Sequence, residues 1–186
     1  MKTASVVLRT AFAVCFAFVM SSASCDLFDK VDDVTFEIAL DHTFQVNETA
    51  EAQDVSYGLQ ELLDAASVNS DFDKYKDKIK SVTVTSVTYT IKNVETEVIF
   101  SDGVIGFSAA TGSTATKVAS LGVENIKAAE NQVKNLPYDQ AAIDELSNLL
   151  KNDKKANIYL SGTLSETPAK FDVFVTVKAS ITANAL

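Results

Sequence analysis

The chain has 186 residues, of which 47% are hydrophobic and 22% charged, and its formal net charge at pH 7 is −9. This length suits a single domain with a substantial buried core. The lysines are scattered and Arg9 is the only arginine. Because a phosphate backbone is bound by clustered Lys and Arg, the composition argues against a nucleic-acid partner.

The first 24 residues are predicted to be an export signal. Lys2 and Arg9 precede the apolar run 11–20, which is followed by the small residues 21–24 and then Cys25. A positive start, a short apolar core and a small-residue cleavage region are typical of a signal peptide, and the apolar run is too short to cross a bilayer. Residues 1–24 are therefore excluded from the predicted fold.

The segment Ser22-Ala23-Ser24-Cys25 resembles the lipobox of bacterial lipoproteins, in the relaxed form of Bacteroidetes-type proteins. Ser22 stands where most lipoboxes have an aliphatic residue. The resemblance implies that Cys25 is the lipid-attachment residue and the new N-terminus, anchored in the cell envelope at the outer membrane. The alternative is ordinary secretion or a periplasmic location without lipid, because Ser22 and Ser24 also fit the small-x-small rule of the general signal peptidase.

Cleavage before Cys25 leaves fourteen lysines against twenty-five acidic residues, a formal charge of −11. The other cysteine, Cys15, lies inside the signal, so no internal disulfide is expected in the mature chain. Residues 25–33 are acidic and are predicted to be a solvated tether. A second interpretation is a surface-export signal, which Lys30, Asp32 and Asp33 resemble.

Alternating apolar residues predict strands near both ends of the mature chain. Residues 34–46 follow this alternation at even positions, which indicates one half-buried strand or two strands that meet at a bend near Asp41-His42. Residues 171–181 are apolar at odd positions. Between them, residues 80–93 are rich in β-branched residues and shift phase near Thr85-Ser86, which predicts a bulge. Further strands are expected at 94–100, at 104–108 after an Asp102-Gly103 turn, and at 156–165, closed by residues 166–168.

Helical spacing is found in three places. Val55, Leu59, Leu62 and Ala66 predict a helix over 54–66 with Asp54 as N-cap. A short helix is expected over 72–79. The strongest pattern covers 139–152, where acidic residues come first and lysines last, as the helix dipole favours. Residues 123–135 remain ambiguous.

Together these elements predict a mainly β fold with helical excursions, an antiparallel immunoglobulin-like β-sandwich with two or three short helices. One domain is expected over residues 34–186, with its terminal strands paired and a small, polar loop at 108–116. Two amphipathic helices, at 54–66 and 139–152, would allow an alternative role as a carrier of an apolar ligand held between sheet and helices.

The sequence offers little for catalysis, and no enzyme activity, cofactor or metal is expected. His42 is the only histidine and is interpreted as a bend or rim residue. Asn69-x-Asp71-x-Asp73 resembles the start of a calcium loop, but lysines occupy the positions of its glycine and its bidentate glutamate, so helix capping is the preferred interpretation. Glu95 and Glu97 are interpreted as ordinary exposed-strand acids rather than a glycosidase pair.

The expected function is therefore that of a lipid-anchored envelope protein with a non-catalytic binding or scaffolding role. The membrane is engaged through the lipid on Cys25, and a protein or a glycan is the expected further partner. In a sandwich, end loops and edge strands usually carry binding. Loops near 101–116 and 135–140 are thus the predicted binding regions.

Overall fold

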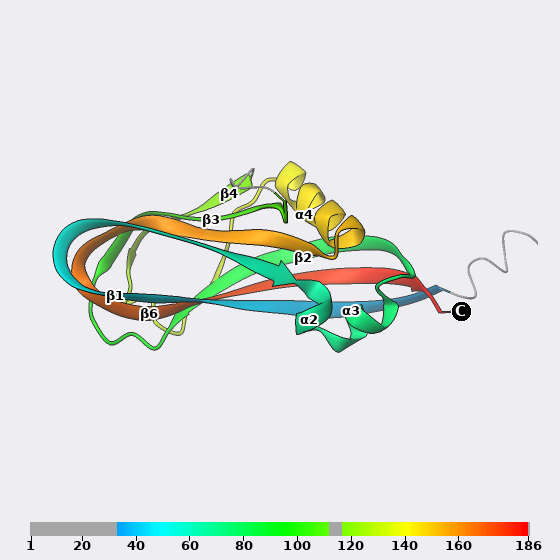
Figure 1. The fold of residues 1–186 in the computed structure, drawn as a ribbon, viewed down its shortest axis with the longest axis horizontal. Helices are drawn as coiled ribbons and strands as arrows, with labels where there is room; N and C mark the ends of the chain where they lie inside the picture. The colour runs from blue at the N-terminus through cyan, green and yellow to red at the C-terminus, as the bar shows by residue number, and fades with distance from the viewer. Residues whose placement is uncertain (1–32, 112–116, 186) are drawn as a thin grey trace, which may run out of the picture.

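A computed structural model describes residues 33–111 and 117–185. The predicted signal, Cys25 and almost all of the tether lie outside these residues. The described elements, shown in Figure 1, are β1 (Asp33–Asp64), α2 (Ala65–Val68), α3 (Ser70–Tyr75), β2 (Ile79–Lys92), β3 (Ile99–Ala109), β4 (Lys117–Asn125), β5 (Val133–Asn135), α4 (Gln140–Asn152) and β6 (Lys155–Asn184). The prediction of a mainly β chain with a few short helices is confirmed.

The fold is organised around one long antiparallel ribbon made of β1 and β6. The two strands pair from Asp33 opposite Asn184 to Asp64 opposite Lys155, so the predicted pairing of the terminal strands is confirmed. Of the two interpretations of residues 34–46, the single strand is confirmed and the bend near Asp41-His42 is wrong, because β1 pairs continuously through that region. Inward positions of β1 such as Leu40 and Phe44 are fully buried, while His42 between them is half-buried.

The ribbon bends back on itself at one irregularity, at the left of Figure 1. Here the register shifts between Glu48 and Ala52, opposite Thr167 and the proline that follows it. The Thr167 hydroxyl donates to the carbonyl of Ala50 and accepts from the Ala52 amide at 3.0 Å. These bonds satisfy backbone groups that the shift leaves unpaired. The predicted end of a strand at 166–168 is therefore a bend within β6.

The remaining strands extend the two halves of this ribbon into one curled antiparallel sheet. β3 pairs with the first half of β6 and β4 pairs with β3, while β2 pairs with the second half of β6 and β5 pairs with β2. The strand order is β4-β3-β6-β2-β5, with β1 beside β6. The sheet thus has the shape of a half-barrel, and the finer description as an immunoglobulin-like sandwich stays a prediction.

The predicted helix over 54–66 is wrong, because residues up to Asp64 belong to β1. Asp54, the predicted N-cap, has a positive φ of 50° within the strand. The spacing of Val55, Leu59 and Leu62 suits a helix, but Val55, Tyr57 and Leu59 also alternate with exposed residues. Pairing with β6 selects this second pattern, and Leu62, expected on the buried face, is 49% exposed.

The other two helical predictions are confirmed with adjusted boundaries. The short helix is α3, which starts earlier than expected, with Asn69 as N-cap accepting from the Phe72 amide at 2.9 Å. Asp139 caps α4 by accepting from the Ala142 amide at 2.7 Å. The helix packs mainly on β2.

The predicted bulge in β2 is also confirmed, as a register shift between Val84 and Ser86. The bulge leaves the Val84 amide without a partner in the ladder. The buried Ser147 hydroxyl of α4 accepts from that amide at 3.0 Å and donates to the Ile143 carbonyl at 2.8 Å. The Ser147 side chain thus supplies the hydrogen bond that the Val84 amide lacks at the bulge, and it links α4 to β2.

Residues 99–109 form one strand rather than two, so the predicted Asp102-Gly103 turn is wrong. Asp102 has a φ of 52°, and the register shifts around Gly103 relative to both β4 and β6. These two residues therefore form a bulge inside β3. The ambiguous stretch 123–135 contains the end of β4, a turn and the short β5.

The core lies inside the curl, where the two halves of the ribbon face each other. Phe100 of β3 and Phe171 of β6 are buried and meet edge to face, with ring centroids 6.3 Å apart. The Phe100 ring also lies on two glycines: a Cβ added at Gly162 would come within 2.5 Å of it, and one at Gly103 within 2.9 Å. These glycines leave the space that a large ring needs between the strands.

Candidate functional site

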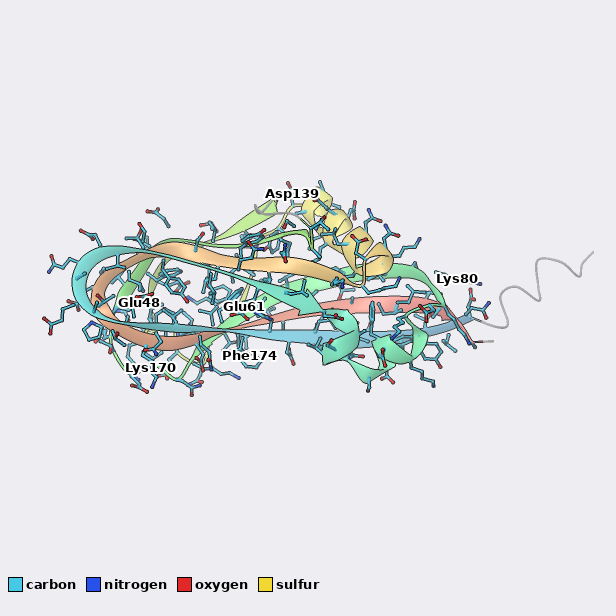
Figure 2. The ribbon with its side chains drawn as sticks, viewed as in Figure 1. Glu48, Glu61, Lys80, Asp139, Lys170 and Phe174 are labelled. Atoms are coloured by element: carbon cyan, nitrogen blue, oxygen red, sulfur yellow. The ribbon has the colours of Figure 1, made fainter. Side chains whose placement is uncertain are left out.

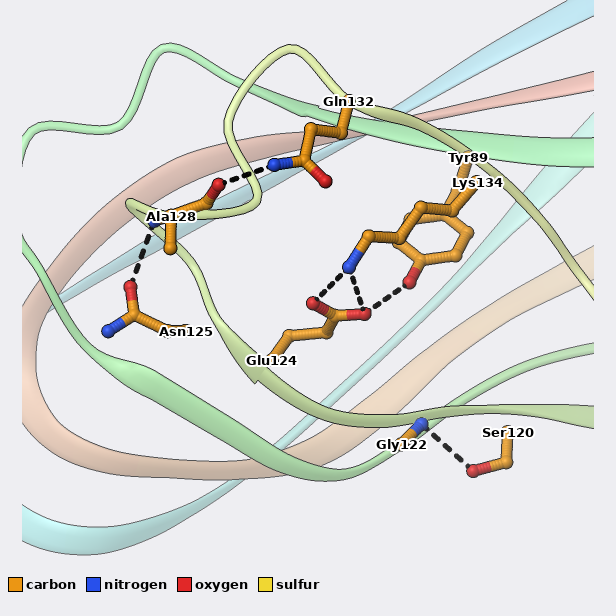
Figure 3. A network of polar contacts seen from close by, with 8 residues as sticks. All are labelled: Tyr89, Ser120, Gly122, Glu124, Asn125, Ala128, Gln132 and Lys134. Carbon is orange, nitrogen blue, oxygen red and sulfur yellow. Dashed lines mark hydrogen bonds and ion pairs between the residues drawn. The ribbon is translucent and has the colours of Figure 1, made fainter.

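A buried charged cluster joins the two ends of the strand order, as Figure 3 shows. Glu124 of β4 accepts from Lys134 of β5 at 2.6 and 2.7 Å, and from the Tyr89 hydroxyl of β2 at 2.6 Å. Glu124 is 8% exposed. We call this cluster, Tyr89, Glu124 and Lys134, the β4–β5 clasp.

Strand register places the three side chains of the clasp. Tyr89 lies directly opposite Lys134 in the β2–β5 pair, and Glu124 lies opposite Phe100 in the β3–β4 pair. Burial raises the pKa of the Tyr89 phenol, and its hydrogen bond to the Glu124 carboxylate raises it further. The phenol therefore stays protonated as a donor. The clasp holds the curl closed on the β4–β5 side.

A shallow recess of about 190 Å³ lies beside the clasp, lined by Glu124, Asn125, Ala128, Ala129, Gln132 and Lys134. The amide side chains of Asn125 and Gln132 in this recess form hydrogen bonds within the turn between β4 and β5. Asn125 accepts from the Ala128 amide and donates to Glu97, while Gln132 donates to the Ala128 carbonyl. These bonds shape the turn between β4 and β5, so we interpret the recess as part of the closure of the sheet.

His42 lies on the opposite side of the curl, where the two runs of β1, residues 33–48 and 52–64, face each other. Its Nε2 is 3.1 Å from Oε2 of Glu61, and its ring packs edge-on against Phe44. Burial lowers the pKa of His42, while the Glu61 carboxylate raises it in part. Nearby, the Tyr57 hydroxyl donates to the Gln45 carbonyl at 3.3 Å. We call this side of the molecule the β1 seam.

His42 does not lie at the predicted bend, because it is half-buried within the continuous strand β1. The carboxylate beside it, Glu61, is nineteen positions further along β1. Sequence reasoning missed this pair because the second run of β1 was expected to be a helix. The missed clasp carried no sequence signal either, since Glu124 and Lys134 both lie within residues 123–135, whose structure was ambiguous.

The other candidate residues do not converge. Asn69 caps α3, while Asp73 pairs with Lys76 at 2.7 Å, so the calcium-like segment is part of a helix start. Glu95 pairs with Lys170 at 2.5 Å and Glu97 accepts from Asn125, which separates the two glutamates. Within residues 33–111 and 117–185, no group of three His, Cys, Asp or Glu side chains is placed to hold a metal. Cys25 lies outside the described residues.

The two predicted binding loops are largely parts of packed structure. Residues 101–109 belong to β3, and residues 112–116 lie outside the described residues. In the 135–140 region, Tyr138 packs against Phe107 and donates from its hydroxyl to the Ile105 carbonyl at 2.5 Å. Burial raises the pKa of this phenol. These contacts tie the segment before α4 to β3.

A different surface, the outer edge of β1, has no paired strand, although side chains of Asn69 and Tyr57 donate to the Ala39 and Gln45 carbonyls of its first run. In the described part of the chain β1 pairs only with β6, so the other side of its backbone has no strand partner. At the bend, an open recess of about 410 Å³ adjoins this edge, lined by Glu51, Ala52, Gln53, Glu166, Thr167 and Pro168. None of the described helices is long and apolar enough to cross a membrane.

Comparisons with known proteins yield no family. No family model and no curated protein match the sequence. Among solved structures, the chain is similar to one from Desmodium yellow mottle tymovirus, with 10% identity, a TM-score of 0.37, and coverage of 82% of this chain and 90% of that chain. A chain from turnip yellow mosaic virus gives 11% identity, a TM-score of 0.34, and coverage of 80% and 96%. Similarities this weak carry no argument about fold or function.

Proposed function

We propose that this protein is a lipid-anchored cell-envelope protein of the outer membrane, whose folded domain has a non-catalytic binding or scaffolding role. The observation that carries the proposal is the order of residues 1–25, a positive start, a short apolar run and small residues ending at Cys25. Two or more acyl chains on one residue hold a protein stably at a membrane. The partner of the domain is a protein or a glycan.

The shape of the domain supports this arrangement. Asp33, the first described residue, pairs with Asn184, so both ends of the described chain lie at one end of an elongated molecule. The bend of the β1–β6 ribbon lies at the other end, and Figure 2 shows Glu48 there, far from Lys80. A lipid on Cys25, eight residues before Asp33, would hold the terminal end near the membrane and present the bend outward.

The roles of the ionisable side chains support binding rather than catalysis. The Glu124 carboxylate is saturated by Lys134 and Tyr89, and His42 is packed between Phe44 and Glu61. These groups hold the two sides of the curl. The fold is further proposed to be an immunoglobulin-like sandwich, which is supported by the two facing halves of the ribbon and by the contact of Phe100 with Phe171 between them.

The intact mass of the mature protein, extracted from its own envelope, tests the anchor. The proposal expects a chain that starts at Cys25 and is heavier by two or three acyl chains. The matched control is Cys25→Ser, which removes the sulfur that accepts lipid and is expected to lack the added mass. An unmodified wild-type chain starting at Cys25 would overturn the anchor and favour a secreted or periplasmic protein.

A further inference from the structure

The outer edge of β1 is a long strand edge without a strand partner in the described structure. Its two runs, 33–48 and 52–64, pair with β6 on one side, and in the described structure no strand pairs on the other. Natural proteins commonly protect such edges with charged side chains (lysine above all), proline, β-bulges or a short strand, and β1 has acidic residues and one register shift. β1 has 32 residues and contains neither lysine nor proline. By contrast, β5 at another edge has three residues, one of them Lys134.

The edge is also strongly acidic, with eight carboxylates and no Lys or Arg along β1. Four of them have local partners: Asp33 pairs with Lys80, Asp41 accepts from Thr176, Glu61 contacts His42, and Asp64 caps α2. The other four are Glu37, Glu48, Glu51 and Asp54. Three of these lie within seven residues at the bend, so the negative charge there is concentrated and uncompensated by β1 itself.

The bend offers more than charge. The recess of about 410 Å³ places Glu51 of β1 and Glu166 of β6 on the wall of one open hollow beside the edge. Further along the same run, the inward side chains of Val55, Tyr57 and Leu59 are only partly buried. A strand added to this edge would gain backbone hydrogen bonds, cover these apolar side chains and place a long cationic side chain in the hollow.

A second copy of the chain fits this edge poorly. Pairing two identical edges would bring Glu48, Glu51 and Asp54 of one copy near the same acidic strand of the other, and like charges across a strand pair are destabilising. Lysine-rich or arginine-rich partners have the opposite charge and the long apolar stems that suit the half-buried side chains.

We propose that the outer edge of β1 around residues 48–62 binds an extended, basic segment of another protein by strand addition. This inference rests on the proposed binding role, but it does not require the lipid anchor. It commits the partner to a polypeptide rather than a glycan. Backbone hydrogen bonds along the edge supply the affinity, and the carboxylates at the bend select Lys or Arg at alternate positions.

The test uses a peptide of about twelve residues, the length of the second run of β1, in which Lys alternates with Val or Thr. Binding to the full chain is measured by titration calorimetry, with hydrogen exchange to locate the contact. The same peptide carrying N-methyl groups on alternate amides keeps its charge but cannot pair along an edge. We expect about tenfold weaker binding of this analogue, and slowed exchange confined to residues 48–62 for the unmodified peptide.

Two matched triple variants isolate the role of charge. Glu48→Gln, Glu51→Gln and Asp54→Asn together should weaken binding about tenfold, whereas Asp71→Asn, Asp77→Asn and Asp144→Asn, with the same change in net charge, should leave it within about twofold. Each set is also made in the Cys25→Ser chain. Equal peptide binding by the Cys25→Ser chain and by wild type would show that the β1 edge acts independently of the lipid anchor. Failure of the anchor proposal would be seen only in the intact mass.

Several results would overturn the proposal. These are equal affinity for the N-methylated peptide, equal weakening by both triple variants, protection at β4 or β5 instead of β1, or no binding. A dimer in sedimentation experiments, with slower amide hydrogen exchange along β1, would assign the edge to a second copy of the chain. That result would also overturn the proposal.

Discussion

The two sides of the curled sheet close in different ways. On the β4–β5 side, Glu124 is nearly buried and its oxygens receive three short hydrogen bonds from Lys134 and Tyr89. On the β1 side, the described contacts between the two runs of one strand are that of His42 with Glu61 and the hydrogen bond from the Tyr57 hydroxyl to the Gln45 carbonyl. On the first side the Glu124 carboxylate is matched by the Lys134 ammonium. On the second side the carboxylates of Glu48, Glu51 and Asp54 have no ion-pair partner in the described structure. Stability and recognition are therefore expected to separate between the two sides.

The largest expected effect comes from breaking the β4–β5 clasp. Lys134→Met leaves the Glu124 carboxylate buried with only the Tyr89 hydroxyl as a partner. Breaking a buried ion pair costs about 3–5 kcal/mol, and because Lys134 is 33% exposed we expect a loss of about 2–3 kcal/mol in unfolding free energy. Urea denaturation measures it.

The control for the clasp is the double variant Lys134→Met with Glu124→Gln. Removing the uncompensated charge should recover a large part of the lost stability, because an amide is far cheaper to bury than an unpaired carboxylate. If Lys134→Met alone has no effect, the clasp does not hold the β4–β5 side closed, and the contrast between the two sides fails.

The next effect tests the packing between the two halves of the ribbon. Gly162→Ala places a methyl group 2.5 Å from the buried Phe100 ring, so the ring must move against Phe171. Overpacking of this kind costs about 1–3 kcal/mol, which should lower the melting temperature measurably. Gly58→Ala is the matched control, because its nearest neighbour would be 3.9 Å away. Equal melting temperatures for the two variants would contradict the tight contact.

A loss no larger than this is expected at the β2 bulge, where Ser147 of α4 accepts from the Val84 amide. Ser147→Ala removes the hydroxyl that accepts from the Val84 amide, and a buried donor without a partner costs about 1–3 kcal/mol. Thermal unfolding measures the loss, and hydrogen exchange should show faster exchange of the Val84 amide. Ser147→Thr keeps the hydroxyl and should preserve slow exchange. Unchanged exchange in Ser147→Ala would show that another group satisfies the amide.

How far the sequence predicted these features depends on whether the signal was local. The terminal strands, the β2 bulge and α4 were predictable, because alternation, a phase shift and helical spacing with early acids and late lysines are written in neighbouring residues. The helix over 54–66 failed because Val55, Leu59 and Leu62 fit two periods, and only pairing with β6 decides between them. The clasp and the His42–Glu61 pair depend on the curl of the whole sheet, which no local pattern encodes.

At the β1 seam, the pH dependence of stability should carry a signature of His42. Burial lowers its pKa below the ordinary value of 6.5, so the folded chain prefers the neutral imidazole. The resulting stability is complete above pH 6.5 and is lost as the pH falls toward the lower folded-state pKa. The measurement is unfolding free energy between pH 7 and 5 in wild type and His42→Gln. The variant should lose less on acidification, and parallel curves would show that His42 does not titrate differently on folding.

The smallest effect on stability is expected where the largest effect on binding is proposed. Glu48, Glu51 and Asp54 have no ion-pair partner in the described structure, so replacing them with Gln, Gln and Asn removes mutual repulsion and no attractive contact. Asn also tolerates the positive φ of Asp54. We expect unfolding free energy to change by less than about 0.5 kcal/mol, measured in urea at low and at high salt. A loss above 1 kcal/mol at both salt concentrations would mean that these acids help to hold the bend together. The two sides of the sheet would then share one structural role, and the acidic edge could no longer be assigned to a partner.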